Sequence, residues 1–251
     1  MHLKTNIYLP VPHRPRRYFP WALIFFLFAT PIFAQTVRPL IDENIVRRSG
    51  KSASGKIEYI NDSTQTLTVT LEAKSFTVSD TGKLSYRPLD SSIHAKLSAM
   101  SFRILPKQNY FVFYEASADQ LPSWFVIYAT FAGFKERTEE GFRIQIQLPH
   151  TIYLLPKEEL RKDELMIQMA DYHPTEKKVV VRVENNGSSF GRVLEADVTS
   201  AREQATQGGF PVFPFSDRQI EIPWEGPSIP ARLQLRLAHF RLEQAVNEPA
   251  P

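Results

Sequence analysis

The sequence predicts an all-β protein composed of two β-sandwiches in tandem. Apolar and polar residues alternate with a period of two along most of the chain. Turn-forming residues interrupt these segments every ~8–15 residues, which is the spacing of short strands in a sandwich. A charged stretch at residues 157–164 divides the alternating pattern into two parts. We therefore expect one sandwich at 36–156 and a second, smaller one at 164–244.

The first part of the chain contains strand-like segments joined by recognisable turns. Asn-Asp-Ser at 61–63 forms one turn, and Asp-Thr-Gly at 80–82 closes a predicted hairpin. Residues 124–131 form an apolar run, which predicts a central strand. The expected strands cover residues 55–60, 66–71, 76–78, 83–86, 110–114, 124–131 and 142–155, with 102–107 leading into the fifth.

The second part repeats this pattern in fewer segments. The expected strands cover residues 165–170, 178–184, 192–198, 219–224 and 232–240. Residues 208–215 combine phenylalanine with proline and are not expected in the middle of a sheet, because proline has no N–H for the ladder. They form either an exposed partner-binding loop or a connection whose phenylalanines fold inward. We expect the tail from 244 to 251 to be frayed.

The N-terminus has the order of an export signal. Arg14, Arg16 and Arg17 precede an apolar run at 21–33, and Ala34 offers a small residue for cleavage. The run is too short to span a hydrocarbon core of about 30 Å. We predict that residues 1–34 are a signal peptide cleaved near Ala34, that the mature chain resides in the periplasm, and that it does not insert into the membrane. The alternative is an uncleaved membrane anchor.

Composition excludes several classes of function. The chain of 251 residues has no cysteine, so disulfides, thiolate catalysis and cysteine-ligated metals are excluded. Its formal charge of +3 arises in the export signal, since the remainder carries 26 basic and 27 acidic residues. That balance gives no electrostatic reason to expect nucleic-acid binding. The four histidines after the signal lack metal-ligand spacing, and no catalytic motif is present. We predict no enzymatic activity, no catalytic or metal-binding residue and no cofactor.

Residues 142–148 have the most informative pattern. The side chains of Phe142, Ile144, Ile146 and Leu148 share one face of an extended strand, while Arg143, Gln145 and Gln147 occupy the other. Two interpretations require this same period. The apolar row packs into the core of its own domain, or it lies at a sheet edge and enters a partner by β-strand addition.

The order and spacing of several segments resemble those of the PapD-like periplasmic chaperones of the chaperone–usher pathway. The segments are 55–63, 102–107, 121–125 and 142–156 in the first part, and 181–187 and 213–224 in the second. The resemblance implies two immunoglobulin-like domains and a role in fimbrium biogenesis and cell wall organization. Such a chaperone binds and caps pilus or fimbrial-type subunits by donor strand complementation and delivers them to an outer-membrane usher, without a cofactor. Phe142, Ile144, Ile146 and Leu148 match its donor strand.

The resemblance also directs attention to an anchor for the subunit. In this family, an arginine on the first strand and a lysine on the donor strand bind the C-terminal carboxylate of the subunit. Counting back from Pro156, the lysine position falls at Thr151, and His150 lies beside it on the opposite face. Arg38 and Arg47 both lie near the arginine position, and neither aligns without a gap. The candidate anchors are therefore Arg38, Arg47, His150 and Thr151.

Two other functions are consistent with the sequence. A structural or adhesive immunoglobulin-like envelope protein would show the same strands, with the row at 142–148 in its own core. A periplasmic hydrolase on a β scaffold is a third reading, which no motif supports.

Overall fold

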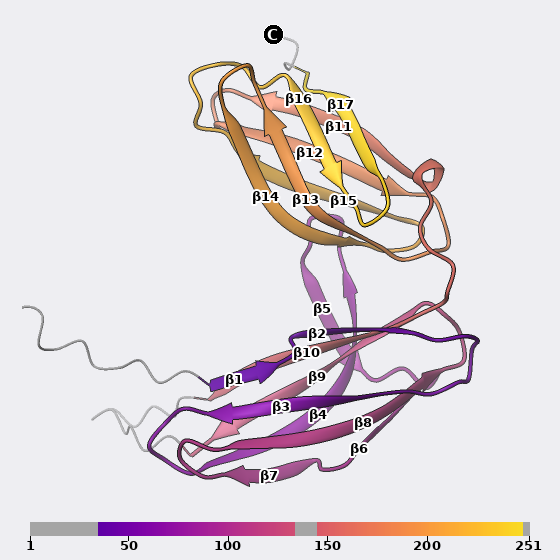
Figure 1. Cartoon of the computed structure of the whole chain (residues 1–251), viewed down its shortest axis with the longest axis vertical. Helices are drawn as coiled ribbons and strands as arrows, with labels where there is room; N and C mark the ends of the chain where they lie inside the picture. Colours follow the sequence, from indigo (N-terminus) through magenta and orange to yellow (C-terminus); the bar gives the residue numbers. More distant parts are fainter. Residues whose placement is uncertain (1–34, 134–144, 248–251) are drawn as a thin grey trace, which may run out of the picture. The chain divides into compact units, whose positions relative to one another are not determined.

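A computed structural model of the chain describes residues 35–133 and 145–247 (Figure 1). These residues form strands with one short 3₁₀ helix, η2 (Lys162–Glu164), which confirms the predicted all-β class. The predicted signal peptide at 1–34, and Phe142 and Ile144 of the apolar row, lie outside the described residues. The strands of the first sandwich are β1 (Gln35–Arg38), β2 (Ile41–Ile45), β3 (Ala53–Asn61), β4 (Leu67–Val78), β5 (Leu84–Pro88), β6 (Ile93–Leu97), β7 (Ser101–Ile104), β8 (Asn109–Ala118), β9 (Ser123–Ala132) and β10 (Ile146–Leu155).

Two sheets make up the first sandwich. One has the strand order β1-β3-β8-β6, and the other has the order β2-β10-β9-β4-β5, with β7 also paired to β4. The first segment of the chain therefore contributes to both sheets, β1 antiparallel to β3 and β2 parallel to β10. Strand β9 lies between β10 and β4, which confirms the prediction that residues 124–131 are central.

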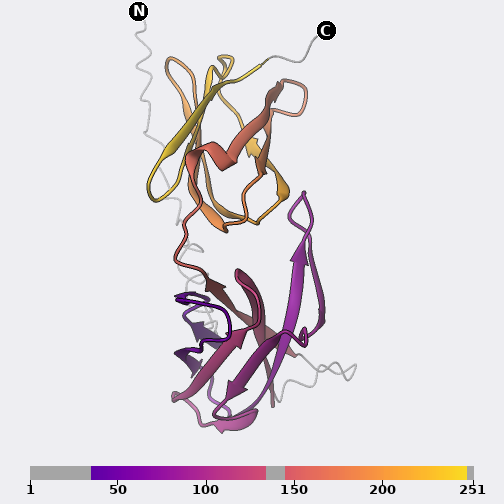
Figure 2. The same ribbon diagram turned by 90° about the vertical axis from the view of Figure 1, so that its right-hand side faces the viewer.

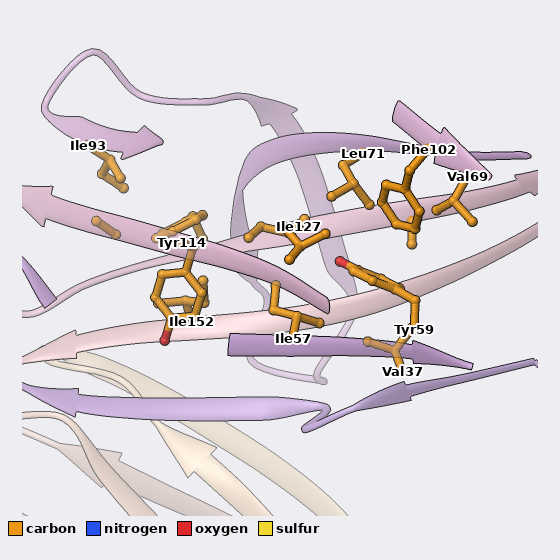
Figure 3. Packing of buried hydrophobic residues seen from close by; sticks show 14 of the residues in the cluster. Val37, Ile57, Tyr59, Val69, Leu71, Ile93, Phe102, Tyr114, Ile127 and Ile152 are labelled. Atoms are coloured by element: carbon orange, nitrogen blue, oxygen red, sulfur yellow. The ribbon is translucent and has the colours of Figure 1, made fainter. Parts of the chain in front are cut away.

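The core of the first sandwich is built from the inward side chains of both sheets (Figure 3). Tyr59 of β3 contacts Phe102 at 5.4 Å and Phe131 at 6.3 Å between ring centroids. Ile57, Ile127 and Ile152 are completely buried. Alternation along each strand sends these residues to one face, so the predicted period of two produces the core directly.

Three features of this sandwich differ from the sequence prediction. The segments at 66–71 and 76–78 belong to one long strand, β4. Its far end pairs in the predicted hairpin with β5, whose five residues are all exposed, and this hairpin projects from the sandwich (Figure 2). Strands β1, β2 and β6 were not predicted. They are four or five residues long, and such short segments give too few alternations to recognise a period.

The second sandwich pairs a three-stranded sheet of order β11-β12-β15 with a four-stranded sheet of order β14-β13-β16-β17. Trp224, Ile222 and Leu235 are among the buried residues between them. Its strands are β11 (Leu165–His173), β12 (Lys178–Asn185), β13 (Gly191–Thr199), β14 (Gln204–Val212), β15 (Ser216–Pro223), β16 (Arg232–Arg236) and β17 (Arg241–Ala245). The last strand of the first sandwich ends at Leu155, so the change of sheets occurs around the predicted linker.

The aromatic and proline-rich segment at 208–215 divides between the two predicted roles. Its first half belongs to β14, an edge strand, which is where proline is tolerated. Phe210 and Phe213 are buried, whereas Phe215 is 74% exposed. The segment is therefore the end of an edge strand followed by a short connection, and two of its three phenylalanines fold inward.

Two predictions at the C-terminus were wrong. Residues 232–240 are not one strand, because the chain turns after Arg236 and the Leu237 N–H donates to the Phe240 carbonyl at 3.0 Å. The described part of the tail, residues 244–247, is held by hydrogen bonds of Asn247, and residues 248–251 lie outside the described residues. The Asn247 N–H donates to the Ala170 carbonyl, and the Asn247 carbonyl accepts from the Tyr172 N–H, both at 2.8 Å. These bonds to the outer edge of β11 satisfy backbone groups that would otherwise remain unpaired.

A buried asparagine closes the same turn in each sandwich. The Asn61 side chain is fully buried, donates to the carbonyls of Gln65 at 2.7 Å and Ile104 at 3.0 Å, and accepts from the Ser63 N–H at 3.0 Å. Asn185 after β12 likewise donates to the Ser189 carbonyl and accepts from the Gly187 N–H. Each amide supplies the donors and the acceptor that a buried turn requires.

We expect Asn61→Ala to lower the free energy of unfolding by about 2–4 kcal/mol, because the substitution leaves buried backbone groups without partners. Urea denaturation measures this change. Asn109→Ala is the matched control, since the Asn109 side chain is exposed and donates only to Glu58 at the surface. Its effect should stay within about 0.5 kcal/mol. Equal effects of the two substitutions would contradict the role of the buried turn.

Candidate functional site

Strand β10 has one edge that is occupied along only half its length. Residues Ile146–Leu154 pair antiparallel with β9. On the opposite side, β2 pairs with β10 only from Thr151 to Leu155. Among the described residues, no strand pairs with this side of β10 from Ile146 to His150. The strand therefore offers an unpaired stretch of backbone to a partner.

The direction of the backbone groups along this open edge follows from two hydrogen bonds. The Thr151 N–H donates to the Leu40 carbonyl at 2.8 Å, and the Leu155 carbonyl accepts from the Val46 N–H at 2.7 Å. Alternate residues of a strand direct their N–H and C=O groups to the same side. The backbone groups of Gln147 and Pro149 therefore point to the open edge. Proline has no N–H, so the donors of this edge end at Gln147.

The apolar row of β10 has the predicted alternation where it is described. Ile146 and Leu148 lie opposite Phe131 and Ala129 of β9 and pack against the edge of the sandwich core. Both are half-buried, whereas Ile152, further along the same face, is fully buried. On the opposite face, Gln147 is exposed and its side chain donates to Thr130 Oγ1 at 3.3 Å. The row thus becomes accessible along the unpaired part of the strand.

The four candidate anchor residues occupy different surroundings. Thr151 is half-buried and lies on the face opposite His150, as predicted. Arg38 ends β1, close in sequence to Leu40, whose carbonyl accepts from Thr151. Arg47 lies two residues after the last residue of β2, Ile45, which is opposite Leu155. Both arginines are exposed, and neither forms an ion pair with a described residue.

His150 is buried inside the sandwich. Its Nδ1 donates to the Pro39 carbonyl at 2.5 Å, and its ring centroid lies 6.0 Å from that of Tyr114. Burial lowers the pKa of His150, and this effect exceeds the opposing effects of the Pro39 bond and the Asp42 charge. The side chain thus has no exposed surface with which to meet a carboxylate from solution.

A polar group that the sequence analysis missed lies beside His150. The Tyr114 hydroxyl donates to Asp42 Oδ2 and accepts from Asn44 Nδ2 at 3.0 Å. Desolvation, the main cause, raises the pKa of Tyr114, and the bond to Asp42 adds to this shift. Gly55 of β3 provides the space, since a Cβ there would lie 2.4 Å from atoms of the Tyr114 side chain.

In β2 the polar residues face the interior of the sandwich and the isoleucines face outward, which is the reverse of what its sequence pattern predicts. Ile41 and Ile45 are 45% and 63% exposed, while Asp42 and Asn44 alternate with them on the face that meets Tyr114. An apolar-inward rule assigns the opposite orientation. The tyrosine opposite them on another strand reverses it, and no local sequence signal reports that contact.

Comparison with known proteins identifies the fold. Neither a protein-family model nor a curated protein sequence matches the chain. One similar structure is that of the Salmonella enterica SafA pilin in complex with the SafB chaperone. The matched chain is 14% identical to this one, the match covers 86% of this chain and 98% of that chain, and the TM-score is 0.52. The YadV chaperone is 10% identical, with 84% and 98% covered and a TM-score of 0.52. The chain has the fold of the PapD-like chaperones. Its two sandwiches are therefore the two immunoglobulin-like domains that the resemblance implied.

Two further findings concern the described residues. None of their helices is long and apolar enough to cross a membrane. They contain no group of three histidine, aspartate or glutamate residues arranged to hold a metal ion.

We expect Gly55→Ala to destabilise the PapD-like fold by about 1–3 kcal/mol, because the new methyl group collides with the Tyr114 side chain. Gly208→Ala is the matched control in another strand, since a Cβ at Gly208 meets no atom within 4 Å. Thermal unfolding of both variants tests the expectation. An unchanged melting temperature for Gly55→Ala would show that Tyr114 is not held where the structure places it.

Proposed function

We propose that the chain is a periplasmic assembly chaperone that binds pilus-type subunits through the open edge of β10. The observation that carries this proposal is the coincidence of two features over Ile146–His150. No described strand pairs with one side of the backbone, and the apolar side chains of Ile146 and Leu148 are only half-buried. An incomplete immunoglobulin-like subunit requires both a strand and apolar side chains.

The edge supplies the two kinds of interaction that strand addition uses. Gln147 offers an N–H and a carbonyl, and Pro149 offers a carbonyl, to a strand of the subunit. The row of Phe142, Ile144, Ile146 and Leu148 enters the groove of the subunit as a donor strand. Each large apolar side chain contributes about 1.5–3 kcal/mol when it becomes fully buried. Binding then needs neither a cofactor nor catalysis.

We further propose that Arg38 and Thr151 receive the C-terminal carboxylate of the subunit. Arg38 is exposed and unpaired among the described residues, and it ends β1 two residues before Leu40, whose carbonyl accepts from the Thr151 N–H. A guanidinium compensates the loss of water around a carboxylate, and a hydroxyl adds one hydrogen bond. Arg47, at the far end of β2, does not share this position.

The remaining assignments complete this function. We propose that residues 1–34 direct export and are removed near Ala34, and that the domains cover 36–156 and 164–244. The loaded chaperone would deliver its subunit to an outer-membrane usher. SafB, whose fold is similar, was solved together with a pilin, which supports a pilus subunit as the partner.

A second function has one observation in its favour. Ile146 and Leu148 touch the core of their own sandwich, as they would in a structural or adhesive envelope protein with no client. The two functions differ in what these side chains contribute to stability, because a donor row stabilises the complex more than it stabilises the free chain.

The double variant Ile146→Thr/Leu148→Thr should fold and lose its subunit. Threonine retains β-propensity and removes apolar surface. Because both side chains are half-buried, we expect the variant to be less destabilised than the single variant Ile152→Thr, which should lose about 2–4 kcal/mol by burying a hydroxyl in a packed core. Thermal unfolding and co-purification with a co-expressed pilus subunit from the same genome provide the two measurements.

The two functions give opposite results in this experiment. A double variant that unfolds more readily than Ile152→Thr assigns the row to the core and defeats the proposed mechanism. A stable double variant that retains the subunit defeats it as well.

Arg38→Ala should weaken retention of the subunit by about tenfold or more, since the carboxylate loses its cationic partner. Arg47→Ala is the matched control, because it removes the same charge from the other end of β2. Surface plasmon resonance with the purified subunit distinguishes them. Equal affinities for the two variants would remove Arg38 from the anchor while leaving the donor edge untouched.

A further inference from the structure

His150 lies where β10 changes from an open to an occupied edge. Before it, the backbone groups of Pro149 and Gln147 point to the open side. After it, the Thr151 N–H donates to the Leu40 carbonyl and begins the pairing with β2. The His150 side chain bonds to the Pro39 carbonyl, so the crossing of the chain from β1 to β2 is held by two successive residues of β10.

The bond to Pro39 fixes the protonation of the imidazole ring. A carbonyl oxygen only accepts hydrogen bonds, so Nδ1 carries the proton and Nε2 of the neutral ring is an acceptor. Nε2 is buried and has no hydrogen-bond partner among the described residues. The polar groups around the ring are Tyr114 from β8 and Asp42 from β2, and its register partner on β9 is the apolar Ile127.

Strand β2 depends on hydrogen bonds more than on apolar burial. Ile41 and Ile45 are largely exposed, whereas Asp42 and Asn44 are held by the Tyr114 hydroxyl. Its other attachments include the backbone ladder with β10, the Pro39 bond to His150, and Val46, which follows the strand and is buried in the core. A strand attached in this way detaches more easily than one with an apolar inner face.

We propose that His150 is a positioning residue that fixes the crossing at Pro39–Leu40, and that protonation of its Nε2 releases β2 and extends the open edge of β10 toward Leu155. The use of that longer edge by a subunit rests on the proposed function, but the release itself does not.

Protonation favours release for an electrostatic reason. A second N–H on the buried ring would lie at Nε2, which is buried and contacts no hydrogen-bond partner among the described residues. While β2 is paired with β10, burial holds the pKa of His150 below its ordinary value. A released ring in water regains a pKa near ~6.5, so release becomes easier as the pH falls below that value.

Hydrogen exchange of the full mature chain tests the proposal without any subunit. The amide of Thr151 points to β2, and the adjacent amide of Ile152 points to β9, so Ile152 is an internal control. Between about pH 7.5 and about pH 5.5, we expect the protection factor of Thr151 and of the β2 amides to fall, by at most about tenfold per pH unit. Protection of Ile152 should stay constant.

Two variants distinguish the hydrogen bond that His150 donates from the space that its ring fills. His150→Asn places an amide donor near Nδ1 and cannot take up a proton, so Thr151 should keep its protection at both pH values. His150→Phe keeps the ring and removes the donor, so Thr151 should lose about tenfold in protection at both. Wild-type protection that does not change with pH, or a His150→Phe variant that equals wild type, would overturn the proposal. If His150→Asn fails to fold, the other two measurements still decide it.

Discussion

The first segment of the chain crosses from one sheet to the other between β1 and β2, and the position of this crossing decides which backbone groups of β10 remain unpaired. Had β2 begun several residues earlier, the edge of β10 would be covered and the strand would be an ordinary member of the sheet. Because β2 begins opposite Thr151, five residues of β10 have no strand on that side among residues 35–133 and 145–247. Exposed edges normally invite aggregation, and Pro149 limits this one by removing a donor.

The two halves of β10 have different environments on a shared face. Ile152 is fully buried, whereas Ile146 and Leu148 lie where the core reaches the end of the sandwich. One side of a strand can therefore belong to the core at one end and to a partner at the other. This continuity explains why period alone could not separate the two readings of the row at 142–148.

Polar groups hold the places where the chain changes direction. Asn61 and Asn185 close the corresponding turns of the two sandwiches with the same set of amide bonds. Tyr114, Asp42, Asn44 and His150 hold the crossing of the first segment. In each case a buried side chain satisfies backbone or side-chain groups that regular strand pairing cannot reach. Such groups carry directional information that apolar packing lacks.

The sequence by itself determined the all-β class, the tandem sandwiches, the central position of residues 124–131 and the face occupied by Ile146 and Leu148. These properties follow from a period of two and from turn residues, both of which are local. Only the tertiary structure decided that β10 has a half-open edge, that His150 is buried, and that Asp42 and Asn44 rather than the isoleucines of β2 meet Tyr114. Each of these depends on a contact between residues far apart in the chain, such as His150 with Pro39. Local periodicity records which residues share a face, but it does not record what lies opposite that face.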